Sequence, residues 1–132
     1  MGNQSLLKAV CSSEAPAAIG PYSQGVVAGN LLFVSGQIPL DPATGDFVKG
    51  GIEEKTHRVL KNLKAVVETA GSDLSHVVKT TIFLADLSHF AAVNRIYAEY
   101  FSGVFPARST VEVSGLPRGA EIEVEAVVYL HR

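Results

Sequence analysis

Two residues of opposite charge, Arg108 and Glu123, lie in a segment near the end of the chain that has the pattern of a β-hairpin. The segment FPARSTVEVSGLPRGAEIEVEA spans residues 105–126, and its turn would centre on GLPRG. In such a hairpin Glu123 lies nearly opposite Val111, with Arg108 a few residues away along the same pair of strands. A guanidinium presents paired donors that match both oxygens of a carboxylate. The sequence therefore suggests a pocket in which Arg108 and Glu123 face one small acidic ligand.

A simpler interpretation of the two charges is a solvated surface. In the last strand, glutamates alternate with apolar residues: Glu121, Glu123 and Glu125 with Ile122, Val124, Ala126 and Val128. Alternation alone favours a solvated acidic face. Arg108 follows Pro106-Ala107, where a loop enters a strand, which is a typical position for a side chain that points into a cleft. Arg118 lies in the predicted turn, and we expect it to be solvated.

Other residue types that could do chemistry lack the required setting. The four histidines, His57, His76, His89 and His131, show neither metal-ligand spacing nor a nucleophile partner. Ser35 lacks the G-x-S-x-G context of a hydrolase nucleophile. No Gly-rich segment follows a strand in the manner that binds phosphates. We expect neither a metal nor a nucleotide.

The elements that position Arg108 and Glu123 can be predicted from apolar periodicity. AVCSS at residues 9–13 indicates a short edge strand, and residues 25–38 indicate a hairpin that turns at Gly29-Asn30. Residues 52–70 have the three- and four-residue apolar spacing of an amphipathic helix, ended by Gly71. HVVKTTIFLADL at 76–87 is rich in β-branched residues and predicts a buried strand.

A second helix is predicted after that strand and before the closing hairpin. Ser88 or Asp86 would cap it, and its apolar stripe would consist of Phe90, Val93, Tyr97 and Phe101. The order is therefore ββαβαββ, an α+β arrangement in which two helices cover only one face of the sheet. The other face carries many apolar side chains, which favours a self-associated oligomer over a monomer.

Length and composition narrow the classes of function. A chain of 132 residues that is 47% hydrophobic can bury one core, so we expect one domain over residues 1–132. The net charge of −2 argues against nucleic acid and anionic membranes as partners, because binding phosphates relies on clustered Lys and Arg. The single cysteine excludes an intramolecular disulfide and fits a reducing compartment, the cytoplasm or the mitochondrion.

Four ordered segments give the chain a family resemblance. They are AIGPYSQG at 18–25, FVSGQIPLDPATG at 33–45, DLSHFAAVNRIYAEYF at 86–101, and the segment at 105–126. Together they resemble the RidA family, also called YjgF or UK114, and the likeness extends from about Ala15 to Tyr129. The resemblance implies a chorismate-mutase-like α+β fold that assembles as a homotrimer with ligand clefts at the subunit interfaces.

The resemblance also implies an activity. Family members similar to this chain are deaminases that hydrolyse 2-iminobutanoate and 2-iminopropanoate to 2-oxo acids and ammonia, without a cofactor. Two alternatives remain open. The chain could be an RNA-acting translation inhibitor or endoribonuclease, as some relatives are described, or a non-catalytic trimer that binds small acids or acts as a chaperone.

Site residues carry over from the family position by position. The essential arginine matches Arg108, and the carboxylate that handles the water matches Glu123. The residues that line the substrate pocket match Tyr22, Ser35, Gly36, Phe90 and Asn94, and Thr110 occupies a place that is often Cys in similar bacterial proteins. Without the resemblance, Tyr22 and Phe90 would be packing aromatics and Asn94 a surface amide. Burial would raise the pKa of Glu123, whereas an ion pair with Arg108 would lower it, and the sequence leaves both open.

Overall fold

The computed structural model describes residues 6–131, so the two ends of the expected 1–132 domain lie outside the described residues. The strands are β1 (Leu7–Val10), β2 (Gly25–Ala28), β3 (Leu31–Gln37), β4 (Val77–Leu84), β5 (Ala107–Glu112) and β6 (Ile122–Tyr129). The two α-helices of this part of the chain are α1 (Ile52–Thr69) and α2 (Phe90–Tyr100). Short 3₁₀ turns occupy Leu74–His76, Leu87–His89 and Pro117–Gly119. The predicted order ββαβαββ is confirmed from β2 onward, and β1 precedes it as the predicted edge strand, two residues earlier in the chain than expected.

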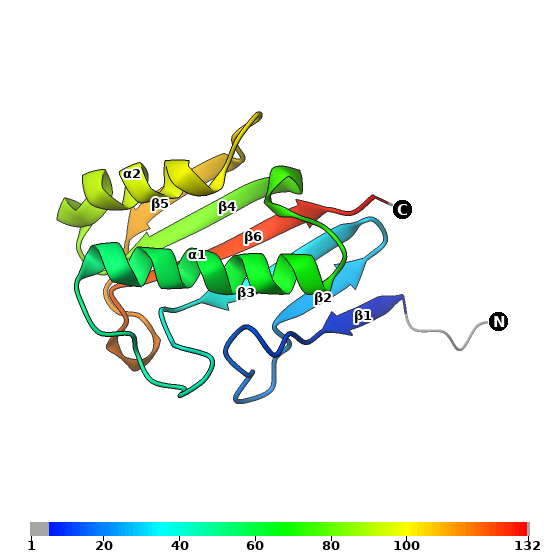
Figure 1. Ribbon diagram of the computed structural model, residues 1–132, viewed down its shortest axis with the longest axis horizontal. Coiled ribbons are helices and arrows are strands. Elements are labelled where there is room, and N and C mark those ends of the chain that lie inside the picture. The colour runs from blue at the N-terminus through cyan, green and yellow to red at the C-terminus, as the bar shows by residue number, and fades with distance from the viewer. Residues whose placement is uncertain (1–5, 132) are drawn as a thin grey trace.

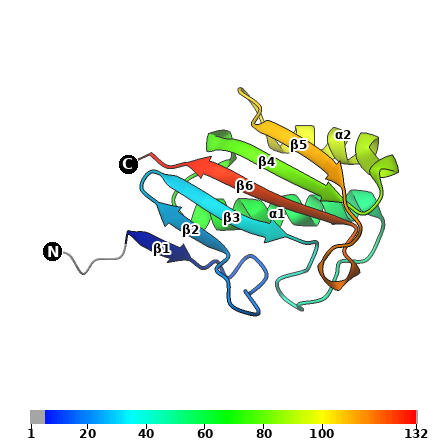
Figure 2. The same cartoon turned by 180° about the vertical axis from the view of Figure 1, so that it is seen from behind.

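All six strands form one sheet in the order β1-β2-β3-β6-β4-β5. Both helices lie against the same face of this sheet (Figure 1), and the view from behind shows no helix in front of the strands (Figure 2). We call the uncovered side the open face. A mixed α+β fold with two helices on one face was predicted, and the structure confirms it.

The predicted closing hairpin is wrong. Strand β4 lies between β5 and β6, parallel to β5 and antiparallel to β6. Residues 113–121 therefore connect two strands that are not neighbours, and this connection passes the end of β4 (Figure 2). Val111 and Glu123 do align, but both pair with Phe83 of β4, one from each side.

The core lies between the sheet and the two helices. Its largest fully buried side chains come from every layer, namely Leu32, Leu60, Leu63, Ile82, Leu84 and Ile122. Burying each of these relative to leaving it exposed contributes about 1.5–3 kcal/mol. The core thus fixes α1 across β3 and β6, the two strands that meet at the site described below.

The apolar stripe predicted for helix α2 is confirmed at Val93, Tyr97 and Phe101 but not at Phe90. Val93, Ile96 and Tyr97 are buried, whereas Phe90 is 40% exposed. The helix follows a 3₁₀ turn in which the Asp86 side chain accepts a hydrogen bond from the Ser88 backbone N–H at 2.9 Å. This turn makes Phe90 the first residue of the helix, at the edge of the sheet and outside the core.

The open face keeps large apolar side chains in contact with solvent. Phe33 of β3, Val111 of β5 and Tyr129 of β6 are 47%, 41% and 40% exposed. Large apolar side chains exposed on one face of a sheet indicate an interaction site.

No helix within residues 6–131 is long and apolar enough to cross a membrane.

Candidate active site

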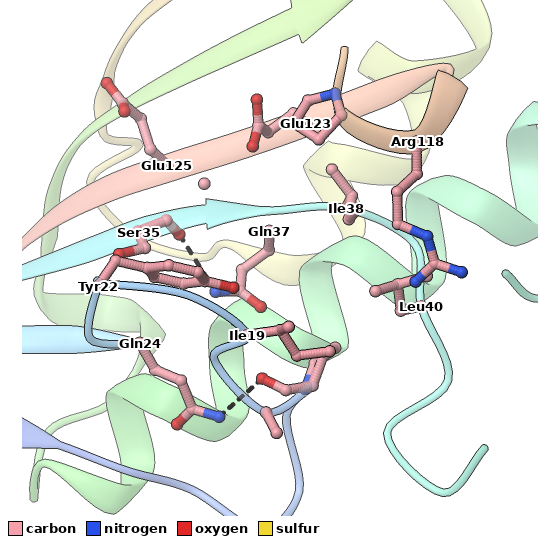
Figure 3. Close-up of a pocket in the computed structure, with 14 residues that line it drawn as sticks. Ile19, Tyr22, Gln24, Ser35, Gln37, Ile38, Leu40, Arg118, Glu123 and Glu125 are labelled. Carbon is pink, nitrogen blue, oxygen red and sulfur yellow. Dashed lines mark hydrogen bonds between the residues drawn. The ribbon is translucent and has the colours of Figure 1, made fainter. Parts of the chain in front are cut away.

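A cavity of about 630 Å³ opens on the sheet where β3 and β6 meet the loop before β2 (Figure 3). Four predicted site residues line it: Tyr22, Ser35, Gly36 and Glu123. Apolar side chains, including Ile19, Ile38 and Leu40, form much of the remaining wall. We call this space the Glu123 cavity. Its size lies in the range of small-molecule pockets in proteins.

Strand β3 carries an irregularity that shapes the cavity. Val34 pairs with Ala126 and Gln37 with Val124, so β3 has one residue more than β6 over this stretch. Such a β-bulge bends the strand and redirects its side chains. The two residues inside it are Ser35 and Gly36, which the sequence analysis assigned to the site.

Gly36 provides the space that the Glu123 carboxyl group occupies. A Cβ atom at position 36 would lie 2.6 Å from the carboxyl carbon of Glu123, so any larger residue here would force the carboxyl group to move. The carboxylate therefore lies directly against the β3 backbone. Among the described residues, none forms a hydrogen bond or an ion pair with it.

The environment of Glu123 raises the pKa of its carboxyl group. Burial is the larger cause, because it disfavours the charged form, and the negative charge of Glu125 adds to it. Of the two directions that the sequence left open, the structure of one chain supports the raised pKa. A carboxylate without a cationic partner remains able to accept a proton.

The loop before β2 is held by a buried amide that the sequence analysis missed. Gln24, 3% exposed, accepts a hydrogen bond from the Ser12 backbone N–H at 2.5 Å and donates to the Pro16 carbonyl at 2.8 Å. The Ser35 hydroxyl donates to the Ser23 carbonyl at 2.5 Å and joins this loop to the bulge. These bonds place the half-exposed ring of Tyr22 at the cavity. One amide in a Pro- and Gly-rich segment has no periodic signal that could reveal this role.

Arg118 also lines the Glu123 cavity, although the sequence predicted only a solvated turn residue. It is exposed, as expected, and has a positive φ of 58° within the 3₁₀ turn. Its guanidinium lies over the Phe47 ring at 5.4 Å and donates to the Gly45 carbonyl at 3.1 Å. Figure 3 shows it beside Leu40, across the cavity from Tyr22.

The remaining predicted site residues gather around Arg108, outside the cavity. The Arg108 Nη1 group donates to Asn94 Oδ1 at 2.8 Å, and the guanidinium carbon lies 5.6 Å from the centre of the Phe90 ring. It lies 5.0 Å from the centre of the Tyr97 ring, a contact that the sequence analysis did not predict. Thr110, two residues further along β5, has a buried hydroxyl oxygen with no partner among the described residues.

Arg108 and Glu123 lie on opposite faces of the sheet within one chain. Arg108 pairs with Thr80, whereas Glu123 pairs with Phe83, and residues three apart on a strand point to opposite sides. Two strand spacings, about 10 Å, also separate the strands β5 and β6. The pocket that these two residues were expected to share is therefore not formed by one chain alone.

Comparison with known proteins identifies the family. A family model described as Endoribonuclease L-PSP matches residues 12–130. The chain belongs to this family, the RidA family. The RidA resemblance expected from the four sequence segments is thereby confirmed.

Relatives within the RidA family carry different names. Protein DfrA of Myxococcus xanthus is 56% identical over 91% of this chain and 93% of that protein. The 2-iminobutanoate/2-iminopropanoate deaminase of Homo sapiens is 48% identical over 93% of this chain and 90% of that protein. Among solved structures, the Rid family protein YyfA of Yersinia pestis has a TM-score of 0.92 and 49% identity, covering 94% of this chain and 99% of that one. The deaminase name supports an enzymatic role, while the family description names a ribonuclease.

Proposed function

We propose that the protein hydrolyses small 2-imino acids, of the 2-iminobutanoate and 2-iminopropanoate type, to 2-oxo acids and ammonia. The proposal depends on one observation: the carboxyl group of Glu123 lies in a cavity, has a raised pKa, and has no cationic partner among the described residues. A carboxylate with a raised pKa and no cationic partner is suited to accept a proton from water as a general base. The deaminase name of the human relative supports the same reaction.

We infer that the complete site forms between copies of the chain in a homotrimer. The Glu123 cavity contributes the base, and the Arg108 group of a neighbouring copy contributes the carboxylate-binding cation. The exposed apolar side chains of the open face support such an assembly, because an uncovered sheet face of this kind favours association. The family resemblance favours three copies.

The proposed reaction begins when Arg108 binds the substrate carboxylate and thereby orients the adjacent C=N carbon. Glu123 positions a water molecule and accepts one of its protons as the oxygen bonds to that carbon. The same carboxyl group returns this proton to the nitrogen, which gives the carbinolamine. It then transfers the carbinolamine hydroxyl proton to the nitrogen, so that ammonia leaves as the C=O bond of the 2-oxo acid forms. Tyr22, Ser35 and Gly36 would line the site on the Glu123 side, with Phe90, Asn94 and Thr110 on the Arg108 side.

This reaction makes modest demands on the protein. An imine is already electrophilic and hydrolyses in water unaided, so the enzyme mainly needs to place the reactants and supply a base. Holding a water molecule and a substrate in reacting geometry can itself account for a large part of a rate enhancement. We therefore propose that no cofactor takes part.

The proposal is tested by following the release of 2-oxobutanoate from 2-iminobutanoate, generated in the assay by a threonine dehydratase. We expect Arg108→Ala to lower kcat/KM by about 100-fold or more, because charge-assisted hydrogen bonds contribute about 1.5–3 kcal/mol each. Glu123→Gln should lower kcat by about 100- to 10,000-fold through loss of the base.

Arg95→Ala is the matched control for the loss of a positive charge. Arg95 lies on the exposed surface of α2 and pairs with Glu53 at 2.8 Å, and an exposed pair of this kind contributes little. Wild-type rates in Arg108→Ala or Glu123→Gln would reject the mechanism. RNA cleavage that weakens with salt and survives Arg108→Ala would instead favour the ribonuclease alternative.

A further inference from the structure

Helix α2 presents three side chains to the guanidinium of Arg108. Phe90, Asn94 and Tyr97 follow each other at intervals of four and three residues, which places them on one side of the helix. Asn94 accepts a hydrogen bond from Nη1, and the rings of Phe90 and Tyr97 lie within 6 Å of the guanidinium carbon, the range of a cation–π contact. Nη2 and Nε make no hydrogen bond with the described residues, so this edge of the guanidinium stays available.

Tyr97 differs from Phe90 and Asn94 because it is buried and its hydroxyl group is held by a hydrogen bond. It is only 4% exposed, and its hydroxyl shares a hydrogen bond of 2.6 Å with the hydroxyl of Thr80, which is fully buried. Thr80 is also the residue of β4 that pairs with Arg108 on β5. One buried hydroxyl pair therefore links the ring plane of Tyr97 to the strand position beside Arg108.

From this geometry we propose that Tyr97, with its ring fixed by the Thr80 hydroxyl, is a positioning residue that holds the Arg108 guanidinium ready for a substrate carboxylate. The inference rests on the proposed function, in which Arg108 binds that carboxylate. Burial raises the pKa of the Tyr97 phenol, even though Thr80 and Arg108 act in the other direction. The ring therefore stays neutral and offers its π face to the cation across the neutral pH range.

Pre-positioning has a measurable consequence. An arginine has many rotamers, and ordering a side chain of this kind on binding costs about 0.5–1.5 kcal/mol. If Tyr97 keeps the guanidinium in place before the ligand arrives, its removal weakens carboxylate binding without removing the cation. Binding lost equally in the ground state and the transition state raises KM and leaves kcat largely unchanged.

The test compares Tyr97→Leu, Tyr97→Phe and Thr80→Val with wild type. Calorimetry measures the Kd of 2-oxobutanoate, and the imine assay gives KM and kcat separately. Tyr97→Leu should raise Kd and KM by about three- to thirtyfold, the range of a cation–π contact. Tyr97→Phe and Thr80→Val keep the ring and lose only the hydrogen bond between the two hydroxyls, so Kd and KM should rise less. Tyr97→Phe should therefore retain most of the carboxylate affinity that Tyr97→Leu loses.

Tyr100→Phe is the matched control. Tyr100 lies three residues further along α2, shares a hydrogen bond of 2.7 Å with His57 Nδ1, and makes no contact with Arg108. Its substitution removes a similar hydroxyl bond from the same helix and should leave Kd and KM at wild-type values. A merely structural role for Tyr97 would reduce the folded fraction and thus kcat, with KM unchanged. That pattern, or equal effects of Tyr97→Phe and Tyr100→Phe on KM, would overturn the proposal.

A second readout does not depend on the substrate. The NMR signal of the Arg108 Nε–Hε group, assigned by its loss in Arg108→Ala, should be displaced in wild type by the Tyr97 and Phe90 rings. In Tyr97→Leu it should move towards the position of a free arginine. An unmoved signal would overturn the inference whatever the protein hydrolyses, whereas a moved signal with normal 2-oxobutanoate binding would place the fault in the proposed function.

Discussion

At the residue scale, the chemistry of the site depends on how one carboxyl group is kept basic. Glu123 lies against Gly36, where no side chain intervenes, and no cation among the described residues compensates its charge. Burial and Glu125 both favour the protonated form, so the pKa rises above its ordinary value of 4.5. A group acting as a base must lose its proton first, and activity therefore falls as the pH drops through this raised pKa.

Glu125→Gln should shift the acidic limb of the kcat/KM profile to lower pH. The substitution removes the smaller of the two causes that raise the pKa of Glu123, while burial, the larger cause, remains. The limb should thus move down without reaching the profile of an exposed carboxyl group. The measurement is imine hydrolysis across pH 4 to 8, roughly the range in which carboxylates and histidines titrate.

Glu99→Gln is the control for this pH prediction. It changes the net charge by the same amount, but Glu99 is an exposed residue of α2 and does not line the Glu123 cavity. Its profile should coincide with that of wild type. An acidic limb that shifts equally in both variants would attribute the effect to overall charge and would count against Glu123 as the base.

At the element scale, the loop of residues 12–24 brings Tyr22 to the cavity and depends on one buried amide. The Gln24 side chain forms hydrogen bonds with backbone groups of Ser12 and Pro16. These residues lie in an irregular loop, where no helix or strand provides backbone partners. Buried backbone groups that lose their partner destabilise a fold much more than a typical hydrogen bond stabilises it. The position of Tyr22 is therefore coupled to the stability of the whole loop.

Gln24→Leu should lower the free energy of unfolding by about 1–3 kcal/mol for each group left without a partner. Urea denaturation followed by circular dichroism provides the measurement. Gln37→Leu is a comparison within the same cavity, because Gln37 is also buried but makes one local bond, to the Ser35 carbonyl at 3.2 Å. A loss for Gln24→Leu no larger than for Gln37→Leu would show that the loop is held by other contacts.

At the scale of the whole molecule, the two halves of the proposed site lie on opposite faces of one sheet, and only a second copy can unite them. Arg108 faces α2, while Glu123 faces the side that carries Phe33 and Tyr129. In a cyclic trimer, each interface brings one patch of a subunit against a different patch of the next. Each cleft would then take its arginine and its glutamate from different chains.

Mixed trimers provide a test of this arrangement. Arg108→Ala and Glu123→Gln, each inactive, are unfolded together in equal amounts and refolded. With random assortment, about one cleft in four combines an intact arginine with an intact glutamate, so about a quarter of the wild-type activity should return. The same mixture without unfolding is the control. No recovery after verified exchange of subunits would mean that one chain supplies both residues.

The sequence allowed much of the fold to be predicted, because helix and strand periodicities are local. The amphipathic pattern of residues 52–70 predicted α1 almost to its ends, and Gly71, with a positive φ of 90°, follows it as expected. Within the predicted stripe of α2 the prediction failed for Phe90 alone, because the 3₁₀ turn before the helix makes Phe90 its first residue, outside the core. It also missed Gln24 and Tyr97, whose roles depend on contacts with distant parts of the chain.

The sequence by itself determined the elements, the RidA family and the residue types of the site. It also determined that Glu123 and Ile122 point to opposite sides of their strand, because alternation is a property of the strand alone. Only the tertiary structure decided that β4 separates β5 from β6 and that Arg108 and Glu123 consequently lie on opposite faces. Which strands become neighbours depends on how the helices pack on the sheet and on pairing between distant segments. The short connection at residues 113–121 carries no sequence signal for either.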